Sequence, residues 1–168
     1  MMLAAMMIAT AVNSIAVAED TVRIPVPYIK QVDALCGGAA AAMVLKYWGS
    51  NSADMKDFLP LIDHRAGGIA NDVLARTLSD RGWTAIQFTG SIESLKQRLR
   101  ARQPVVVLTH ERGERFHYVV AIGYTNNTIV VHDPGRGPSR MISTEHFVRS
   151  WRRSGSWALL VLPSAATR

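Results

Sequence analysis

Residues 27–49 read PYIKQVDALCGGAAAAMVLKYWG, and the part that begins at Cys36 has the pattern of a buried helix. Apolar residues recur there at helical spacing: Ala39, Ala40, Met43, Val44 and Tyr47. Gly49 ends the run, so we expect a helix from Cys36 to about Trp48. A cysteine at a helix start lies beside unpaired N–H groups and the positive end of the helix dipole, which stabilise a thiolate. The two glycines that follow leave the sulfur uncrowded and let a substrate backbone approach.

Cys36 is the only cysteine, so the chain has no internal disulfide. Its thiol is either an inert core group, as free cysteines often are, or an activated nucleophile. The position alone does not separate these readings, and a nucleophile also needs a base. The pattern indicates no metal or cofactor, because one cysteine and dispersed histidines give no zinc spacing, and no acidic run suits calcium.

The rest of the chain predicts helices first and a mostly antiparallel sheet afterwards. An extended segment over 22–29 is broken by Pro25 and Pro27 and cannot be a central strand. The expected helices are 52–59, ending at Pro60, then 69–80, 91–102 and 144–151. The expected strands are 83–88, 105–109, 118–124, 128–132 and 157–162. This order is typical of an α+β fold, and no linker divides it, so we expect one domain over 19–168.

Residues 1–18 have the pattern of a secretory signal peptide. An apolar run ends in Ala16-Val17-Ala18, which fits a cleavage site, although no Lys or Arg precedes the run. The run is short for a membrane span and is interrupted by Asn13 and Ser14. We therefore expect an exported, periplasmic or extracellular protein. An uncleaved membrane anchor and a buried N-terminal helix are the alternatives.

The formal net charge is +6, which would suit an anionic partner such as a membrane surface or an acidic polymer. The positive charges are scattered, however, and the only tight group is Arg149, Arg152 and Arg153. This distribution favours a solvated surface over a nucleic-acid site.

Among the five histidines, the candidate base is the one that a third group can orient. His64 and His146 lie in positions typical of the surface, and His110 faces a charged loop. His117 opens the strand HYVVAIGY, and His132 immediately precedes Asp133.

Strand geometry favours His117 as the base. If 125–127 form a three-residue turn, Tyr124 pairs with Thr128, and His117 and Asp133 lie diagonally on the same sheet face. An imidazole held by a carboxylate is the arrangement that Cys–His enzymes need. A two-residue turn would reverse the faces of all these side chains.

Gln31, shortly before Cys36, carries a neutral amide that can donate a hydrogen bond. Such an amide, with the Cys36 backbone N–H, would stabilise the oxyanion of a tetrahedral intermediate. The alternative is a surface glutamine.

Three segments in this order resemble one family: the opening stretch, FHYVVAIGY (116–124) and VVHDPGRG (130–137). They are similar to the bacteriocin-processing peptidases, family thirty-nine of the papain-like cysteine peptidases, which cleave leader peptides after a double glycine. In that family a Gln precedes the nucleophilic Cys, the His opens a strand ending in Gly-Tyr, and the Asp stands in an Asp-Pro step.

The resemblance implies a papain-like fold and peptide-bond hydrolysis by Cys36, His117 and Asp133, with Gln31 in the oxyanion hole. It implies a peptide or protein substrate, while the predicted signal indicates a stand-alone exported member working with a separate export transporter, in contact with a membrane only through an uncleaved signal. Two other classes remain open: another acyl-transfer enzyme of this fold, transglutaminase-like or an amidase, and a non-catalytic peptide-binding module.

Overall fold

The structure is a computed structural model that describes residues 20–113 and 115–164. The predicted signal peptide over 1–18 lies outside the described residues. The elements in chain order are β1 Val22–Arg23, α1 Cys36–Tyr47, the 3₁₀ helix η1 Met55–Leu61, α2 Asn71–Asp80, β2 Trp83–Thr89, α3 Ile92–Arg100, β3 Val105–Arg112, β4 Arg115–Tyr124, β5 Thr128–Asp133, β6 Gly137–Ser143, α4 Thr144–Arg152 and β7 Trp157–Pro163.

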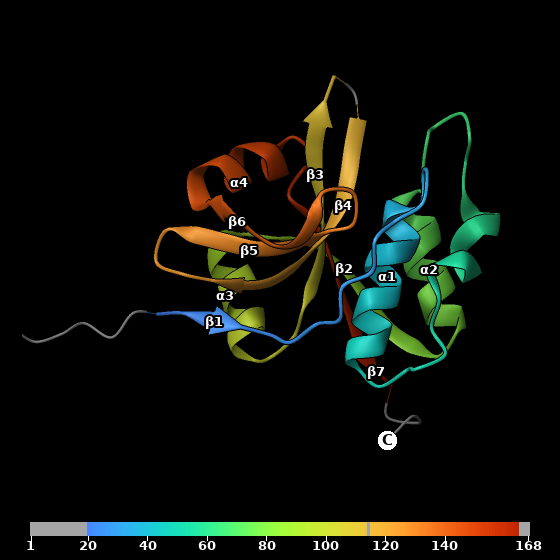
Figure 1. Cartoon of the computed structure of the whole chain (residues 1–168), viewed down its shortest axis with the longest axis horizontal. Coiled ribbons are helices and arrows are strands. Elements are labelled where there is room, and N and C mark those ends of the chain that lie inside the picture. Colours follow the sequence, from blue (N-terminus) through green and yellow to red (C-terminus); the bar gives the residue numbers. More distant parts are fainter. Residues whose placement is uncertain (1–19, 114, 165–168) are drawn as a thin grey trace, which may run out of the picture.

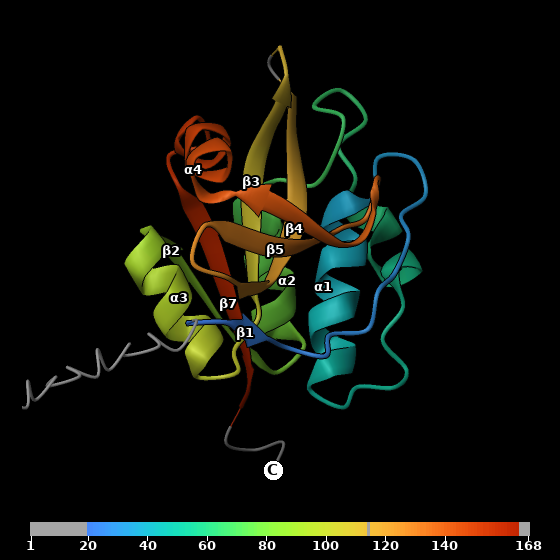
Figure 2. The same ribbon diagram turned by 60° about the vertical axis from the view of Figure 1, so that its left-hand side comes forward.

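The strands form one sheet in the order β2-β7-β3-β4-β5-β6, and β1 pairs with the far end of β4. Every strand pair in the described part of the chain is antiparallel. Figures 1 and 2 show α1, η1 and α2 to one side of the strongly twisted sheet, with α3 and α4 on the other side. The predicted α+β class is therefore confirmed.

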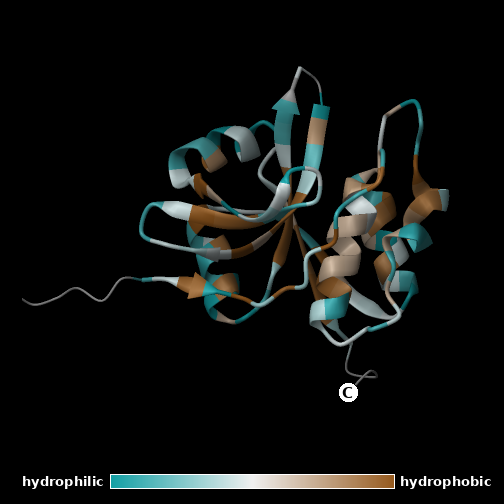
Figure 3. Cartoon of the chain, in the orientation of Figure 1, coloured by the Kyte–Doolittle hydropathy of each residue, from teal (hydrophilic) through white to brown (hydrophobic). Residues whose placement is uncertain are grey.

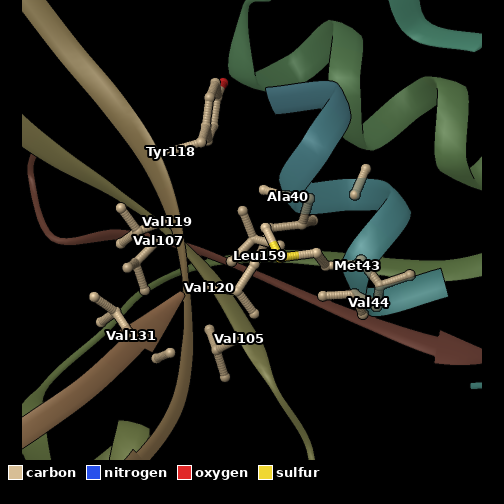
Figure 4. Packing of buried hydrophobic residues seen from close by; sticks show 14 of the residues in the cluster. Ala40, Met43, Val44, Val105, Val107, Tyr118, Val119, Val120, Val131 and Leu159 are labelled. Atoms are coloured by element: carbon tan, nitrogen blue, oxygen red, sulfur yellow. The ribbon is translucent and has the colours of Figure 1, made fainter. Parts of the chain in front are cut away.

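Helix α1 is the buried centre of the helical side. Its residues from Gly37 to Leu45 are all buried, because small alanine side chains let the helix axis approach β4 closely. Figure 4 shows Ala40, Met43 and Val44 of this helix directed toward Val120 and Leu159 of the sheet. Dispersion contacts and the removal of this apolar surface from water hold the N-terminal end of α1 against β4.

The two glycines after Cys36 serve packing rather than access, which corrects the expectation from the sequence. A Cβ added at Gly37 would lie 3.2 Å from the Tyr118 ring, and one at Gly38 would lie 2.9 Å from Met55 O and Phe58 Cβ. The glycines therefore allow β4 and η1 to close on the first turn of α1.

The β4–β5 connection also differs from the prediction. Tyr124 pairs with Ile129, not with Thr128, so four residues lie between the last paired residues, although only 125–127 lie between the two strands. A β-bulge between Ala121 and Gly123 then shifts the register by one residue, and Val120 pairs with His132. The bulge compensates for the longer turn, so the diagonal relation expected between His117 and Asp133 is still formed.

Two further elements were not expected in their observed form. Pro60 lies inside η1, a short 3₁₀ helix, instead of ending a helix. Strand β6 has no counterpart in the prediction.

Figure 3 shows hydrophilic residues over α4 and the tip of the β3–β4 hairpin, around an apolar interior. Among the described residues, no helix is long and apolar enough to cross a membrane.

Candidate active site

A cleft of about 620 Å³ lies where the N-terminal end of α1 meets β4. Its walls include Gln31, Cys36 and His117, three of the four residues that the sequence singled out. The opposite wall is the loop from Ala66 to Ala70, and the end of the β3–β4 hairpin contributes Arg115 and other residues. The cleft is open to solvent.

Cys36 is the first residue of α1, as predicted, and it is partly exposed. The N-cap residue is Leu35, which has no side chain that could bond the first amide groups. The first intrahelical bond runs from Ala39 N to Leu35 O, so the N–H groups before Ala39 make no bond within the helix. Ala34 takes a left-handed conformation with φ of 59°, a strained backbone that turns the chain into the helix.

His117 and Asp133 are in direct contact. His117 Nε2 donates to Asp133 Oδ1 at 2.8 Å, and both side chains are buried, 8% and 3% exposed. Because a carboxylate can only accept, this bond fixes the imidazole tautomer and leaves Nδ1 for Cys36. The Cys36 side chain lines the same cleft as His117 and helps to raise the pKa of the ring. The thiol and the Asp133-held imidazole thus face one cleft.

The electrostatics of the Cys36–His117–Asp133 group favour a charged imidazole. Burial opposes the charged form, but the bond to Asp133 and the contact with Cys36 outweigh it and raise the pKa of His117 to about 9. Burial likewise opposes ionisation of Asp133, but its bonds to His117 and Arg136 hold the pKa of the carboxyl well below its usual range. Asp133 is therefore an anion that holds the imidazole and does not take its proton.

Gln31 is held beside the triad by its main chain. Gln31 N donates to Pro134 O at 3.0 Å, and the Tyr28 hydroxyl bonds Asp133 O and Pro134 O at 3.2 Å. The Gln31 Oε1 atom is buried and has no partner among the described residues. A Cβ added at Gly135 would be 3.5 Å from both Gln31 Oε1 and His117 Cε1, so the glutamine amide and the imidazole both border Gly135.

Sequence reasoning did not identify the arginines that contact Asp133. Arg136 and Arg140 reach Asp133 Oδ2 at 3.3 and 2.9 Å. The Asp-Pro-Gly step signals a turn in which the aspartate accepts backbone N–H groups, and Gly135 N and Arg136 N do bond Oδ1 at 3.0 Å. No sequence signal showed that arginine side chains would complete the arrangement.

Tyr118 is a second residue that sequence reasoning did not single out. Its hydroxyl donates to Ile69 O at 2.9 Å and to Asn71 Oδ1, and its ring lies over Gly37. It therefore joins the loop wall of the cleft to the start of α1.

The remaining histidines lie away from the Cys36–His117–Asp133 contacts. His64 and His146 are exposed, and His110 bonds Gly113 O at the hairpin end. His132 points to the opposite face from Asp133, as expected for its neighbour in a strand, and bonds Val26 O. Among the described residues, no group of three His, Cys, Asp or Glu side chains is arranged to hold a metal ion.

The model of the Peptidase_C39 like family matches residues 23–159. The chain belongs to this family. No curated protein sequence matches the chain.

Solved structures of C39 peptidases share the fold. A putative C39-like peptidase from Bacillus anthracis superposes with a TM-score of 0.72 at 22% identity, covering 86% of this chain and 98% of that one. The peptidase domain of Streptococcus ComA, a bifunctional ABC transporter of a quorum-sensing pathway, gives 0.68 at 22% identity, with 81% and 97% covered. A double-glycine-motif protease from an AMS/PCAT transporter, in complex with the leader peptide, gives 0.66 at 25% identity, with 84% and 94% covered. The fold is the papain-like fold of these peptidases.

Proposed function

We propose that the chain is a cysteine peptidase that hydrolyses peptide bonds through Cys36, His117 and Asp133. One observation carries the proposal: His117, held by a buried bond of 2.8 Å to Asp133, and Cys36, the first residue of α1, line the same open cleft. An inert core thiol needs neither a charged imidazole nor a solvent path. Membership of the Peptidase_C39 like family supports the same reaction class.

In the proposed mechanism Cys36 reacts as a thiolate while His117 holds the proton. The Cys36 sulfur attacks the peptide carbonyl carbon, and the carbonyl oxygen becomes an oxyanion that accepts from the Cys36 N–H and the Gln31 amide. His117 then gives its proton to the leaving amine, and the C–N bond breaks to leave a thioester. Finally His117 takes a proton from water, and the resulting hydroxide attacks the thioester. The C–S bond breaks, which releases the acid product and restores the Cys36 thiolate.

The substrate class that we propose is a peptide or the peptide segment of a protein. A neighbour of the same fold is a double-glycine-motif protease in complex with a leader peptide. The cleft of this chain has a wall of small residues, Ala66, Gly67 and Gly68, which leaves room for a peptide main chain to lie close to the wall.

The test compares wild type with Cys36→Ala on a peptide library under reducing conditions. We expect hydrolysis by the wild type and a loss of at least about a thousandfold for the variant, because the nucleophile is removed. Because Cys36 is the only cysteine, intact mass after iodoacetamide reports its modification without ambiguity.

The matched controls are His117→Ala and His146→Ala. The first removes the proposed base, and the second removes an exposed histidine on α4. The proposal requires that only the first abolishes hydrolysis and slows alkylation of Cys36 at neutral pH. Transfer of the acyl group to added amines in place of water would instead identify an acyl transferase, and an unreactive thiol would indicate a binding module.

A further inference from the structure

The Asp133 carboxylate has a second set of partners on the side away from His117. Its Oδ1 atom accepts from His117 and from two backbone N–H groups. Its Oδ2 atom accepts from Arg140 Nη1 at 2.9 Å and from Arg136 Nη1 at 3.3 Å. Each oxygen thus has its own donors, so the carboxylate is fixed in rotation as well as in position.

The two guanidinium groups reach Asp133 from outside the cleft. Both line a separate cavity of about 400 Å³, whose walls include Asp133 but neither Cys36 nor His117. The arginine side chains are 41% and 47% exposed, whereas that of Asp133 is 3% exposed. Arg136 also pairs with Glu111, which lies in the walls of both the cleft and this cavity. Within the described part of the chain, the hydrogen bonds and ion pairs of these arginines with the Cys36–His117–Asp133 group go to Asp133.

A buried carboxylate with a single cationic partner would stabilise that partner's charge strongly. If His117 were the only cation beside Asp133, the imidazolium would be held so firmly that it would release its proton reluctantly. Arg140 and Arg136 offset part of the negative charge of Asp133 through Oδ2, the oxygen that does not bond His117. The charge that His117 experiences is then smaller than that of a free carboxylate, while the geometry of the bond is kept.

We propose that Arg140, assisted by Arg136, is a positioning residue that fixes the Asp133 carboxylate toward His117 and moderates its charge, so that the imidazole can both hold and release a proton. This inference rests on the proposed peptidase function and deepens it. Arg140 lies on β6, so the strand that sequence reasoning missed supplies a part of the catalytic arrangement.

The decisive variant is Arg140→Met, which keeps most of the apolar stem of the side chain and removes the guanidinium group. We expect kcat to fall about tenfold, the effect of one lost charge-assisted hydrogen bond, with KM little changed because Arg140 is outside the cleft. The alkaline limb of the pH profile should move up by roughly one pH unit, since less positive charge beside Asp133 favours the imidazolium. Arg140→Lys should return the limb toward its wild-type position.

Arg149→Met is the matched control, because this guanidinium pairs with Glu145 on α4 and does not touch Asp133. It should leave kcat and the pH profile unchanged. If Arg140→Met fails to fold in urea titrations, Arg136→Met replaces it, since that variant keeps both Arg140 and the backbone N–H of residue 136.

NMR titration of the His117 ring separates this inference from the proposed function, because it needs no substrate. An upward shift in Arg140→Met, reversed in Arg140→Lys, supports the inference even if no peptide is cleaved. A ring that titrates as in wild type overturns it, whatever the activity. A wild type that titrates as expected but cleaves no peptide refutes the peptidase proposal alone.

Discussion

His117 interacts with two different chemical groups, and the pair of interactions sets its state. Asp133 accepts from Nε2 at 2.8 Å, and Cys36 also raises the pKa of the ring. Burial by itself would favour the neutral ring, so the charged state depends on these two partners. A charged ring beside a thiolate is the state from which attack on a carbonyl begins, with the proton already on the group that must deliver it.

The first pH prediction follows from this charge. Burial opposes the charge on His117, but the bond to Asp133 and the contact with Cys36 raise its pKa to about 9. We therefore expect kcat/KM to fall on the alkaline side with an apparent pKa of about 9, as the imidazolium that protonates the leaving amine is lost.

The variant Asp133→Asn tests whether the charge of Asp133 sets the alkaline limb of the pH profile. An amide carries no charge, so the limb should move down in pH and kcat should fall as the ring loses its orientation. The comparison is of kcat/KM from about pH 5 to pH 10 in buffers of constant ionic strength. A wild-type alkaline limb close to the ordinary histidine value of about 6.5 would contradict the assignment of His117.

At the level of elements, α1 could be predicted from sequence because its apolar period and its final glycine are both local signals. The β4–β5 register could not, because it depends on a bulge at Ile122 that no local pattern reveals. Strand β6 was missed because Gly137, Pro138 and Arg140 give it neither strong strand propensity nor strict alternation. Its pairing partner β5 supplies the hydrogen bonds that make it a strand.

The residues of the candidate site also divide into those that local sequence signals indicate and those that depend on strand pairing. Cys36, His117 and Asp133 could be singled out from the sequence because a helix start, a strand start and a strand end each have a local signal. The contacts on Asp133 Oδ2 were not found, because they come from side chains whose direction depends on the β5–β6 pairing. The glycines after Cys36 were misjudged, since the sequence does not show that Tyr118 and η1 approach them.

Gly123 marks where the bulge allows β1 to approach β4. A Cβ added there would lie 2.3 Å from Val22 O and 3.2 Å from Arg23 Cα, both backbone atoms that cannot rotate away. Gly123→Ala should therefore destabilise the fold by about 1–3 kcal/mol, as overpacking commonly does. Urea unfolding followed by circular dichroism measures the change.

Gly68→Ala is the control for this substitution, because a Cβ at Gly68 meets nothing within 4 Å and its φ is not in the left-handed region. Its free energy of unfolding should stay within about 0.5 kcal/mol of wild type. Equal stability of the two variants would show that the approach of β1 to β4 contributes nothing to the fold.

A second buried histidine, His132, joins segments from distant parts of the chain and lies on the sheet face opposite His117. His132 Nδ1 accepts from Ser139 N at 3.0 Å, so its Nε2–H donates to Val26 O at 2.8 Å. Both nitrogens are therefore used in the neutral form. The ring joins the N-terminal segment that leads to Gln31, strand β5 that ends in Asp133, and strand β6 that carries Arg140.

The two buried histidines respond to pH in opposite directions. Burial lowers the pKa of His132, against the bond to Val26, and nearby Arg23 lowers it further. As pH falls below about 6.5, the unfolded chain takes up the proton first, so stability falls with falling pH. The raised pKa of His117 acts the other way: its contribution is full below about 6.5 and is lost as pH rises toward about 9.

We therefore expect the free energy of unfolding to be greatest near pH 6.5 and to fall on both sides. His132→Gln should lower stability at neutral pH and flatten the acid side below about pH 6.5, while His117→Gln should flatten the alkaline side. His146→Gln, at an exposed position on α4, should leave the curve unchanged. Urea unfolding at each pH gives the curve. An acid side equally steep in wild type and His132→Gln would show that carboxyl groups, and not this ring, set the acid limit, because Asp133 loses its contribution only as pH falls below its ordinary range.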